Sequence, residues 1–235
     1  MRTIAAIVGV VSLAAIGYTA QAGASPGGGR CAAYDPHIPP AKHFSKAIDN
    51  PYFPLPVGRT FVYRGVENGK RELDRMHVTS KTKNVAGITA TVVSDNVYEP
   101  PSKLLEKTFD YYAQDDHGNV WYLGEDTREF LSGGKVDTSG SWLAGRDGAK
   151  PGLIMEATPQ VPDAYRQECL SGEAEDLAWV VARGSSSKHL LRTLEFSPLE
   201  PAIVERKIYA PRVGIVSEHQ LSGGRETLKL VRVTG

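Results

Sequence analysis

Carboxylates follow an aromatic segment in the middle of the chain. Glu125, Asp126 and Glu129 come directly after Val120-Trp121-Tyr122-Leu123, and Trp142 stands a short way further on. Enzymes that cleave sugars combine a carboxylic general acid, a second carboxylate and an aromatic platform for the sugar ring. The pattern is therefore compatible with an extracellular hydrolase or lyase in which Glu125, Asp126 and Glu129 are catalytic. The simpler interpretation is that these aromatics are ordinary residues of a β-sheet.

A second acidic group comprises Glu168, Glu173, Glu175 and Asp176. Hard cations such as Ca²⁺ take roughly six to eight oxygen ligands, so this group could bind a divalent cation such as calcium, and no other cofactor is expected. The favoured interpretation is a solvated acidic turn in which Glu168 pairs with an arginine, because runs of charge commonly face water.

The histidines do not form a zinc motif. Asp35, His37 and His43 could ligate Zn²⁺ or Cu²⁺ if their segment folded back on itself, although exposed loop positions are the default for such residues. The segment Asp115-Asp116-His117-Gly118-Asn119 does not have the spacing of a calcium loop, and we interpret it as a turn. The sequence contains neither a serine nucleophile elbow nor a phosphate-binding loop.

The N-terminal residues predict the location of the protein. One positive charge, Arg2, precedes an apolar run from Ile4 to Ile16, and small residues follow up to Ala22. This is the pattern of a signal peptide over residues 1–22. The run is shorter than the roughly 20 residues that cross a bilayer, and no later stretch predicts a membrane span. We therefore expect a secreted or periplasmic protein.

The charge balance and the two cysteines indicate which partners and which covalent bond to expect. The chain has 27 basic and 27 acidic residues, and loss of Arg2 with the leader changes the formal net charge from 0 to −1. Because Lys and Arg are interspersed with Asp and Glu along the chain, we expect no nucleic-acid partner. Cys31 and Cys169 most simply form one disulfide in an oxidising compartment, and two unpaired thiols are the alternative.

The organisation of the chain follows from its turn residues. Residues 23–30 are a flexible tether, residues 31–58 an extended Pro-rich arm, and residues 59–235 one β-rich domain. Apolar residues recur at period two from Arg59 onward, which predicts an all-β, mainly antiparallel meander. Asp176–Ala182 could instead begin a helix, since acidic residues favour a helix N-terminus. The predicted strands are 60–66, 71–79, 83–98, 103–114, 120–124, 164–170, 174–182, 189–196, 203–210, 214–221 and 227–233.

So many consecutive antiparallel strands must curl into a half-barrel or barrel-like sheet, because sheet twist accumulates. A curled sheet has a concave face, and Phe109, Tyr111, Trp121 and Trp142 are the aromatic residues expected to line it. The favoured function is therefore a non-enzymatic protein that binds an apolar or amphipathic small molecule on this face. The hydrolase or lyase above is one alternative.

A structural or interaction module is the second alternative, in which the arm docks onto a partner through Tyr52 and Phe53. The oligomeric state is left open by the sequence.

Several segments carry a resemblance to other exported proteins. Asn50–Leu55, Gly118–Glu125, Gly140–Gly152, Tyr165–Glu168 and Gly172–Asp176 resemble motifs of an uncharacterised family of secreted bacterial proteins. The segment Tyr209–Val216 is similar to an element of periplasmic proteins with half-barrel folds, except that Arg212 stands where those proteins have glycine. The resemblance implies export and a curved β-sheet, and it brings no known activity with it.

Overall fold

The structure is a computed structural model that describes residues 30–45, 47–184 and 189–235. The predicted signal peptide and the first seven residues of the predicted tether lie outside the described residues. Two short 3-10 helices, Ala41–His43 and Ser132–Gly134, interrupt an all-β chain. Its strands are β1 Phe44–Ser45, β2 Thr60–Glu67, β3 Lys70–Val85, β4 Ile88–Glu99, β5 Lys103–Asp115, β6 Val120–Phe130, β7 Val136–Asp137, β8 Trp142–Leu143, β9 Lys150–Met155, β10 Ala164–Arg166, β11 Glu168–Cys169, β12 Leu177–Arg183, β13 Leu191–Phe196, β14 Val204–Ala210, β15 Gly214–Ser222 and β16 Thr227–Thr234.

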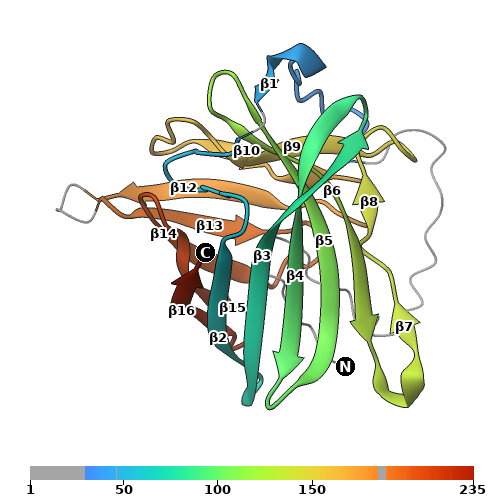
Figure 1. Cartoon of the computed structure of the whole chain (residues 1–235), viewed down its shortest axis with the longest axis vertical. Coiled ribbons are helices and arrows are strands. Elements are labelled where there is room, and N and C mark those ends of the chain that lie inside the picture. Colours follow the sequence, from blue (N-terminus) through green and yellow to red (C-terminus); the bar gives the residue numbers. More distant parts are fainter. Residues whose placement is uncertain (1–29, 46, 185–188) are drawn as a thin grey trace.

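One antiparallel sheet contains these strands. Its order is β10-β12-β13-β14-β15-β16-β2-β3-β4-β5-β6-β9-β11, so the last strand of the chain, β16, pairs with the first long one, β2. In Figure 1 the long strands β3–β6 stand upright and β12–β14, in orange, run across them. The sheet is nearly closed into a barrel, which confirms the predicted curved, barrel-like all-β class.

A single short segment brings the two ends of the sheet together. Ala164–Arg166 pair with β12, whereas Glu168 and Cys169 pair with β9, and Gln167 stands between the two halves. Gly152 of β9 lies directly against the backbone of Arg166 and Gln167, where a Cβ atom would collide with main-chain atoms. Close approach of two backbones requires glycine here, and the approach closes the ring.

Most predicted hairpins are confirmed, including the β2–β3 pair, which turns at Asn68-Gly69 with both residues at positive φ. Two expectations were wrong. The strand predicted over residues 83–98 is divided at Ala86-Gly87, which have positive φ and form the β3–β4 turn. The helix considered over Asp176–Ala182 is instead strand β12, because Ala178 and Val180 alternate into the core and pairing with β13 satisfies the backbone.

The Pro-rich arm is attached to the body at several points. The predicted disulfide joins Cys31 to Cys169 with a Cα–Cα distance of 5.6 Å. Arg30 donates to Glu175 over 2.6 Å, and the Lys150 ammonium donates to the carbonyl of Tyr34. Further along, β1 pairs with β5. The disulfide agrees with the extracytoplasmic location that the leader indicates.

The aromatic pair of the arm belongs to the core. Tyr52 and Phe53 are buried, the Phe53 ring packs edge-on against Tyr112 at 5.4 Å, and Tyr52 donates its hydroxyl to the carbonyl of His189. Two side chains held inside the protein are not available to a partner. The proposed docking role of Tyr52 and Phe53 is therefore contradicted.

The turn between β14 and β15 contains a strained residue. Arg212 has a φ of 64°, in the left-handed region, and its amide donates to the carbonyl of Pro51 over 2.7 Å. A side chain in this conformation costs about 1 kcal/mol, which glycine avoids. We expect Arg212→Gly to raise the free energy of unfolding by about 0.5–1 kcal/mol in urea denaturation. A matched Arg206→Gly exchange, in the middle of β14, should lower it.

Candidate functional site

Carboxylates gather on the inner face of the curled sheet. Side chains alternate between the two faces of a strand, so the register shows which residues point inward with the core residues. The inner positions are strongly acidic, and their carboxyl groups are almost fully buried. These residues are Glu72, Asp74, Asp95, Glu106, Asp110, Glu125, Glu129, Glu195, Glu205 and Glu218.

At the centre of this face, Asp110 and Glu125 stand directly opposite each other on β5 and β6. Gly124, with a φ of 134°, forms a bulge in β6. Because of this bulge, Tyr122 and Glu125 face the same side although they are three residues apart. Glu125 is 2 % exposed, and neither of its oxygens has a hydrogen-bond partner among the described residues. We call Asp110, Glu125 and Glu168 the central acidic site.

Aromatic rings line this site. Tyr112 and Tyr122 are stacked with ring centroids 4.9 Å apart, and Trp142 packs edge-on against Tyr122 at 5.3 Å. The hydroxyl of Tyr122 donates to Asp110 over 2.8 Å. The indole nitrogen of Trp142 donates to Glu168 over 2.8 Å. The acidic groups are thereby held against a wall of large rings.

Burial changes the acidity of the central site. It raises the pKa of Glu125 well above the ordinary carboxyl value, and the neighbouring charges of Glu168 and Asp110 raise it further. The pKa of Asp110 and that of Glu168 are also raised well above their usual range, again mainly by burial. Burial therefore favours the protonated form of these carboxyl groups, and a positive charge beside them would favour the ionised form.

A second part of the inner face contains a buried ammonium. Lys207 on β14 lies 2.8 Å from a carboxylate oxygen of Glu195 and 3.7 Å from one of Glu218. Burial alone would lower the pKa of Lys207, but the surrounding carboxylates raise it above its ordinary value. Lys207 therefore balances this group, and its charge also lowers the pKa of Glu168, whereas no cation is among the groups that shift the pKa of Glu125.

Asp74 on β3 and Asp95 on β4 form a third acidic pair. Burial raises the pKa of Asp74 well above its usual range, and its interaction with Asp95 adds to the shift. None of the four carboxyl oxygens of this pair has a hydrogen-bond partner among the described residues. The inner face therefore collects acidic groups well beyond the central site.

The predicted catalytic residues separate on folding. Glu125 faces inward, and Glu129 faces inward opposite Glu106. Asp126 alternates to the outer face, where a carboxylate oxygen lies 3.7 Å from the guanidinium of Arg128. The three carboxylates therefore do not converge on one point, and the partner that the structure gives Glu125 is Asp110.

Of the four predicted ligand-binding aromatics, Trp142 alone faces the central acidic site. Phe109 and Tyr111 flank the inward-facing Asp110, so strand alternation directs them to the opposite face of β5. There Phe109 lies under the ammonium group of Lys107, and Tyr111, which is buried in the core, lies under that of Lys83. Trp121 is on the opposite face of β6 from Tyr122 and donates to Asp115 over 2.9 Å. Their places in the lining are taken by Tyr112 and Tyr122.

The predicted calcium ligands are also distributed. Glu168 belongs to the central acidic site, and Glu175 accepts hydrogen bonds from Arg30 and the amide of Gly172. Glu173 is exposed. Burial raises the pKa of Asp176 to about 6, which a hydrogen bond with Ser197 and the charge of Lys207 moderate. Among the described residues these four do not form one cluster of ligand atoms.

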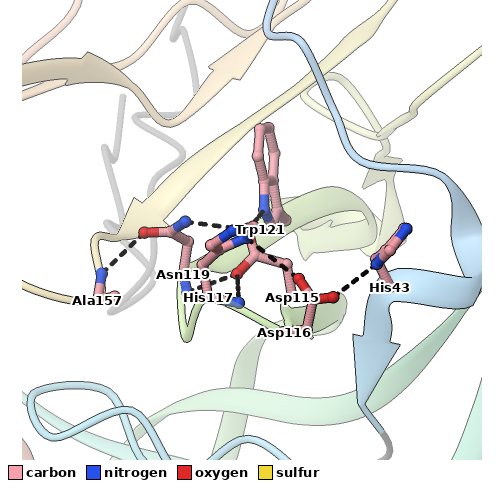
Figure 2. Close-up of polar contacts among 7 residues, drawn as sticks. All are labelled: His43, Asp115, Asp116, His117, Asn119, Trp121 and Ala157. Atoms are coloured by element: carbon pink, nitrogen blue, oxygen red, sulfur yellow. Dashed lines mark hydrogen bonds and ion pairs between the residues drawn. The ribbon is translucent and has the colours of Figure 1, made fainter.

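Figure 2 shows a polar cluster where the arm meets the β5–β6 turn. His43 Nδ1 lies 2.6 Å from Asp116, and this contact lowers the pKa of Asp116. Asp115 accepts from the backbone of His117 and Asn119 and from two side chains, those of Asn119 and Trp121. The predicted turn is confirmed, and its carboxylates fasten the arm to the barrel. His43 on the arm therefore contacts Asp116 of the β5–β6 turn.

A hollow of about 430 Å³ lies beneath the arm, between Pro39, Ile88, Leu123 and the segment around Ala149. Its lining side chains are apolar throughout. Ligand sites combine an apolar wall with a few polar groups that orient the ligand, and this hollow has none. The central acidic site has both.

Sequence reasoning missed Asp110, Tyr112 and the acidic character of the inner face. The signal was present as strict alternation of acid and base, for example in Arg71-Glu72-Leu73-Asp74-Arg75. At period two this pattern puts acids on one face and bases on the other. The sequence was interpreted only as a chain with interspersed charges, and this interpretation did not predict that acidic and basic residues lie on opposite faces of the sheet.

No protein-family model matches the chain, and no curated protein matches it. Solved structures give weak similarity. A Bacteroides fragilis protein, provisionally described as exported and of YmcC-like fold, is 14% identical with a TM-score of 0.44, covering 79% of this chain and 100% of its own. A Parabacteroides distasonis protein, provisionally described as a lipoprotein, is 10% identical with a TM-score of 0.43, covering 79% of this chain and 99% of its own.

In the part of the chain that the structure describes, no helix has both the length and the apolar character needed to cross a membrane.

Proposed function

We propose that this exported protein binds a small amphipathic organic cation at the central acidic site. The observation that carries the proposal is the buried Glu125, which has two unpartnered oxygens and lies opposite Asp110. Burying an ionised carboxylate without a partner costs roughly several kcal/mol of free energy. A bound cation would supply the opposite charge and offset this cost.

The aromatic wall supports the same ligand class. The rings of Tyr112, Tyr122 and Trp142 pack together beside the carboxylates and supply aromatic, apolar surroundings for a cation. Quaternary and alkylated ammonium groups are attracted to aromatic rings by about 0.5–2 kcal/mol for each contact. An ammonium group carried on an apolar body therefore matches both the carboxylates and the rings.

Isothermal titration calorimetry with two probes of similar size tests the proposal. Hexyltrimethylammonium should bind, and hexanesulfonate, with the opposite charge on the same alkyl chain, should not. Glu125→Gln should weaken ammonium binding at least about tenfold, since removing one partner of a buried ion pair costs roughly 2–5 kcal/mol. The exposed Glu173→Gln is the matched control and should bind as the original chain does. Equal binding of both probes, or no loss on Glu125→Gln, contradicts the proposal.

The same carboxyl pair favours a second function, hydrolysis of an extracellular polymer. Glu125 with its raised pKa has the protonation of a general acid, and Asp110 across the strand pair would be the second carboxylate. Turnover of nitrophenyl glycosides that is lost in both Glu125→Gln and Asp110→Asn would establish this function. Turnover that survives both exchanges would exclude it.

A further inference from the structure

The outer face of the barrel is basic where the inner face is acidic. On β2 and β3, Arg64, Arg71 and Arg75 occupy the positions that alternate with the inward Tyr63, Glu72 and Asp74. Across the neighbouring strands, the outward positions include Lys107, Arg128, Lys229 and Arg232. We call these seven residues the basic wall. The chain is nearly neutral overall, but its acidic residues gather on the inner face of these strands and its basic residues on the outer face.

Register aligns several of these cations in one row. Arg232 pairs with Val62, Val62 with Arg75, Arg75 with Asn96, Asn96 with Lys107, and Lys107 with Arg128. Neighbouring strands are about 4.8 Å apart, so this row of six positions extends over roughly 24 Å. The row follows the curve of the sheet and spreads its charges over this side of the barrel.

Most of these charges have no acidic partner. Arg128 lies 3.7 Å from Asp126, and Arg75 and Lys107 rest over the rings of Tyr98 and Phe109. For Arg64, Arg71, Lys229 and Arg232 no salt bridge exists within the described ranges, and all four are exposed. Their positive charge is therefore available to a partner.

The wall is also hollowed and partly apolar. A hollow of about 530 Å³ is lined by Arg64 and Arg71 together with Val66, Leu73 and Pro100, and by Gly65, Glu72 and Thr227. Val66 in this lining is 39% exposed, and Val231 on β16 is 46% exposed. Exposed aliphatic side chains among cations are the combination that anionic bilayer surfaces attract, because headgroup charge and the acyl boundary meet there.

We infer that the basic wall docks the protein onto an anionic phospholipid surface, with lipid headgroup phosphates between Arg64 and Arg71. The inference is independent of the ligand proposed for the inner face, because it uses the opposite side of the same strands.

Cosedimentation of the processed chain with vesicles tests this inference. The protein should pellet with phosphatidylcholine vesicles that contain phosphatidylglycerol, remain in solution with pure phosphatidylcholine, and dissociate from the former at high salt. The double exchange Arg64→Gln and Arg71→Gln should weaken binding about thirtyfold, since each basic residue near an anionic surface contributes a factor of about five. Thermal unfolding of this variant verifies that it is folded.

A matched control removes two charges elsewhere. Arg183→Gln with Arg192→Gln takes two exposed arginines from β12 and β13, across the ring, and should bind the anionic vesicles as the original chain does. Equal loss in both double variants would show attraction by net charge alone and overturn the assignment. Equal binding to neutral vesicles would overturn it, as would retention on an acidic polysaccharide without any vesicle binding.

Discussion

Removing the disulfide should produce the largest loss of stability of any change considered for this protein. The double exchange Cys31→Ser and Cys169→Ser is expected to lower the free energy of unfolding by about 4–5 kcal/mol, because the bond joins residues 138 apart and restricts the unfolded chain strongly. Cys169 also lies in β11, which pairs with β9 where the sheet closes. Urea unfolding of the variant and the oxidised original chain measures the difference.

Reduction of the original chain is the control for this prediction, since it breaks the same bond without changing a side chain. The two preparations should unfold at the same urea concentration. Limited proteolysis should then cut the arm, residues 31–58, before the barrel. A loss below about 1 kcal/mol would show that contacts such as Arg30 with Glu175 and Lys150 with Tyr34 hold the arm without the disulfide.

Local sequence patterns were sufficient to predict most strands. Asn68-Gly69 specifies its hairpin through positive φ at both positions, and the strands from Val204 to Thr234 follow from alternation and turn residues. The closing of the ring could not be predicted, because it depends on contact between Gly152 and residues 166–167. Such contacts are set by the curvature of the whole sheet, which no short window of sequence contains.

The site was predicted in part for the same reason. Glu125, Glu168 and Trp142 were named from composition, but their grouping with Asp110 depends on the bulge at Gly124. A bulge shifts the phase of alternation by one residue, so every face assignment beyond it changes. Trp121, which was expected to line the concave face, instead supports the β5–β6 turn, and Tyr122 lines the site.

The acidic interior implies a specific pH dependence. Burial raises the folded-state pKa of Glu125 above its unfolded value, so between these values the folded chain keeps a proton that the unfolded chain has lost. The contribution of such a group to the free energy of unfolding is complete below its pKa in the unfolded chain. It is lost as the pH rises through its pKa in the folded chain. Glu200, whose pKa is raised to about 7 mainly by burial, acts in the same direction. Without ligand, the melting temperature should therefore be higher at pH 5 than at pH 8.

Glu125→Gln separates stability from function at this site. At pH 8 the variant should unfold with about 1–3 kcal/mol more free energy than the original chain, because a neutral amide replaces a carboxyl group that burial disfavours as an anion. At pH 4, where Glu125 is protonated in both states, the two chains should be nearly equal. Urea unfolding at both pH values measures this, with the exposed Glu173→Gln as the unchanged control. A variant less stable at pH 8 would mean that the folded chain already holds a cation beside Glu125. A gain in stability combined with weaker ammonium binding would show that Glu125 serves ligand binding at the expense of the stability of the ligand-free protein.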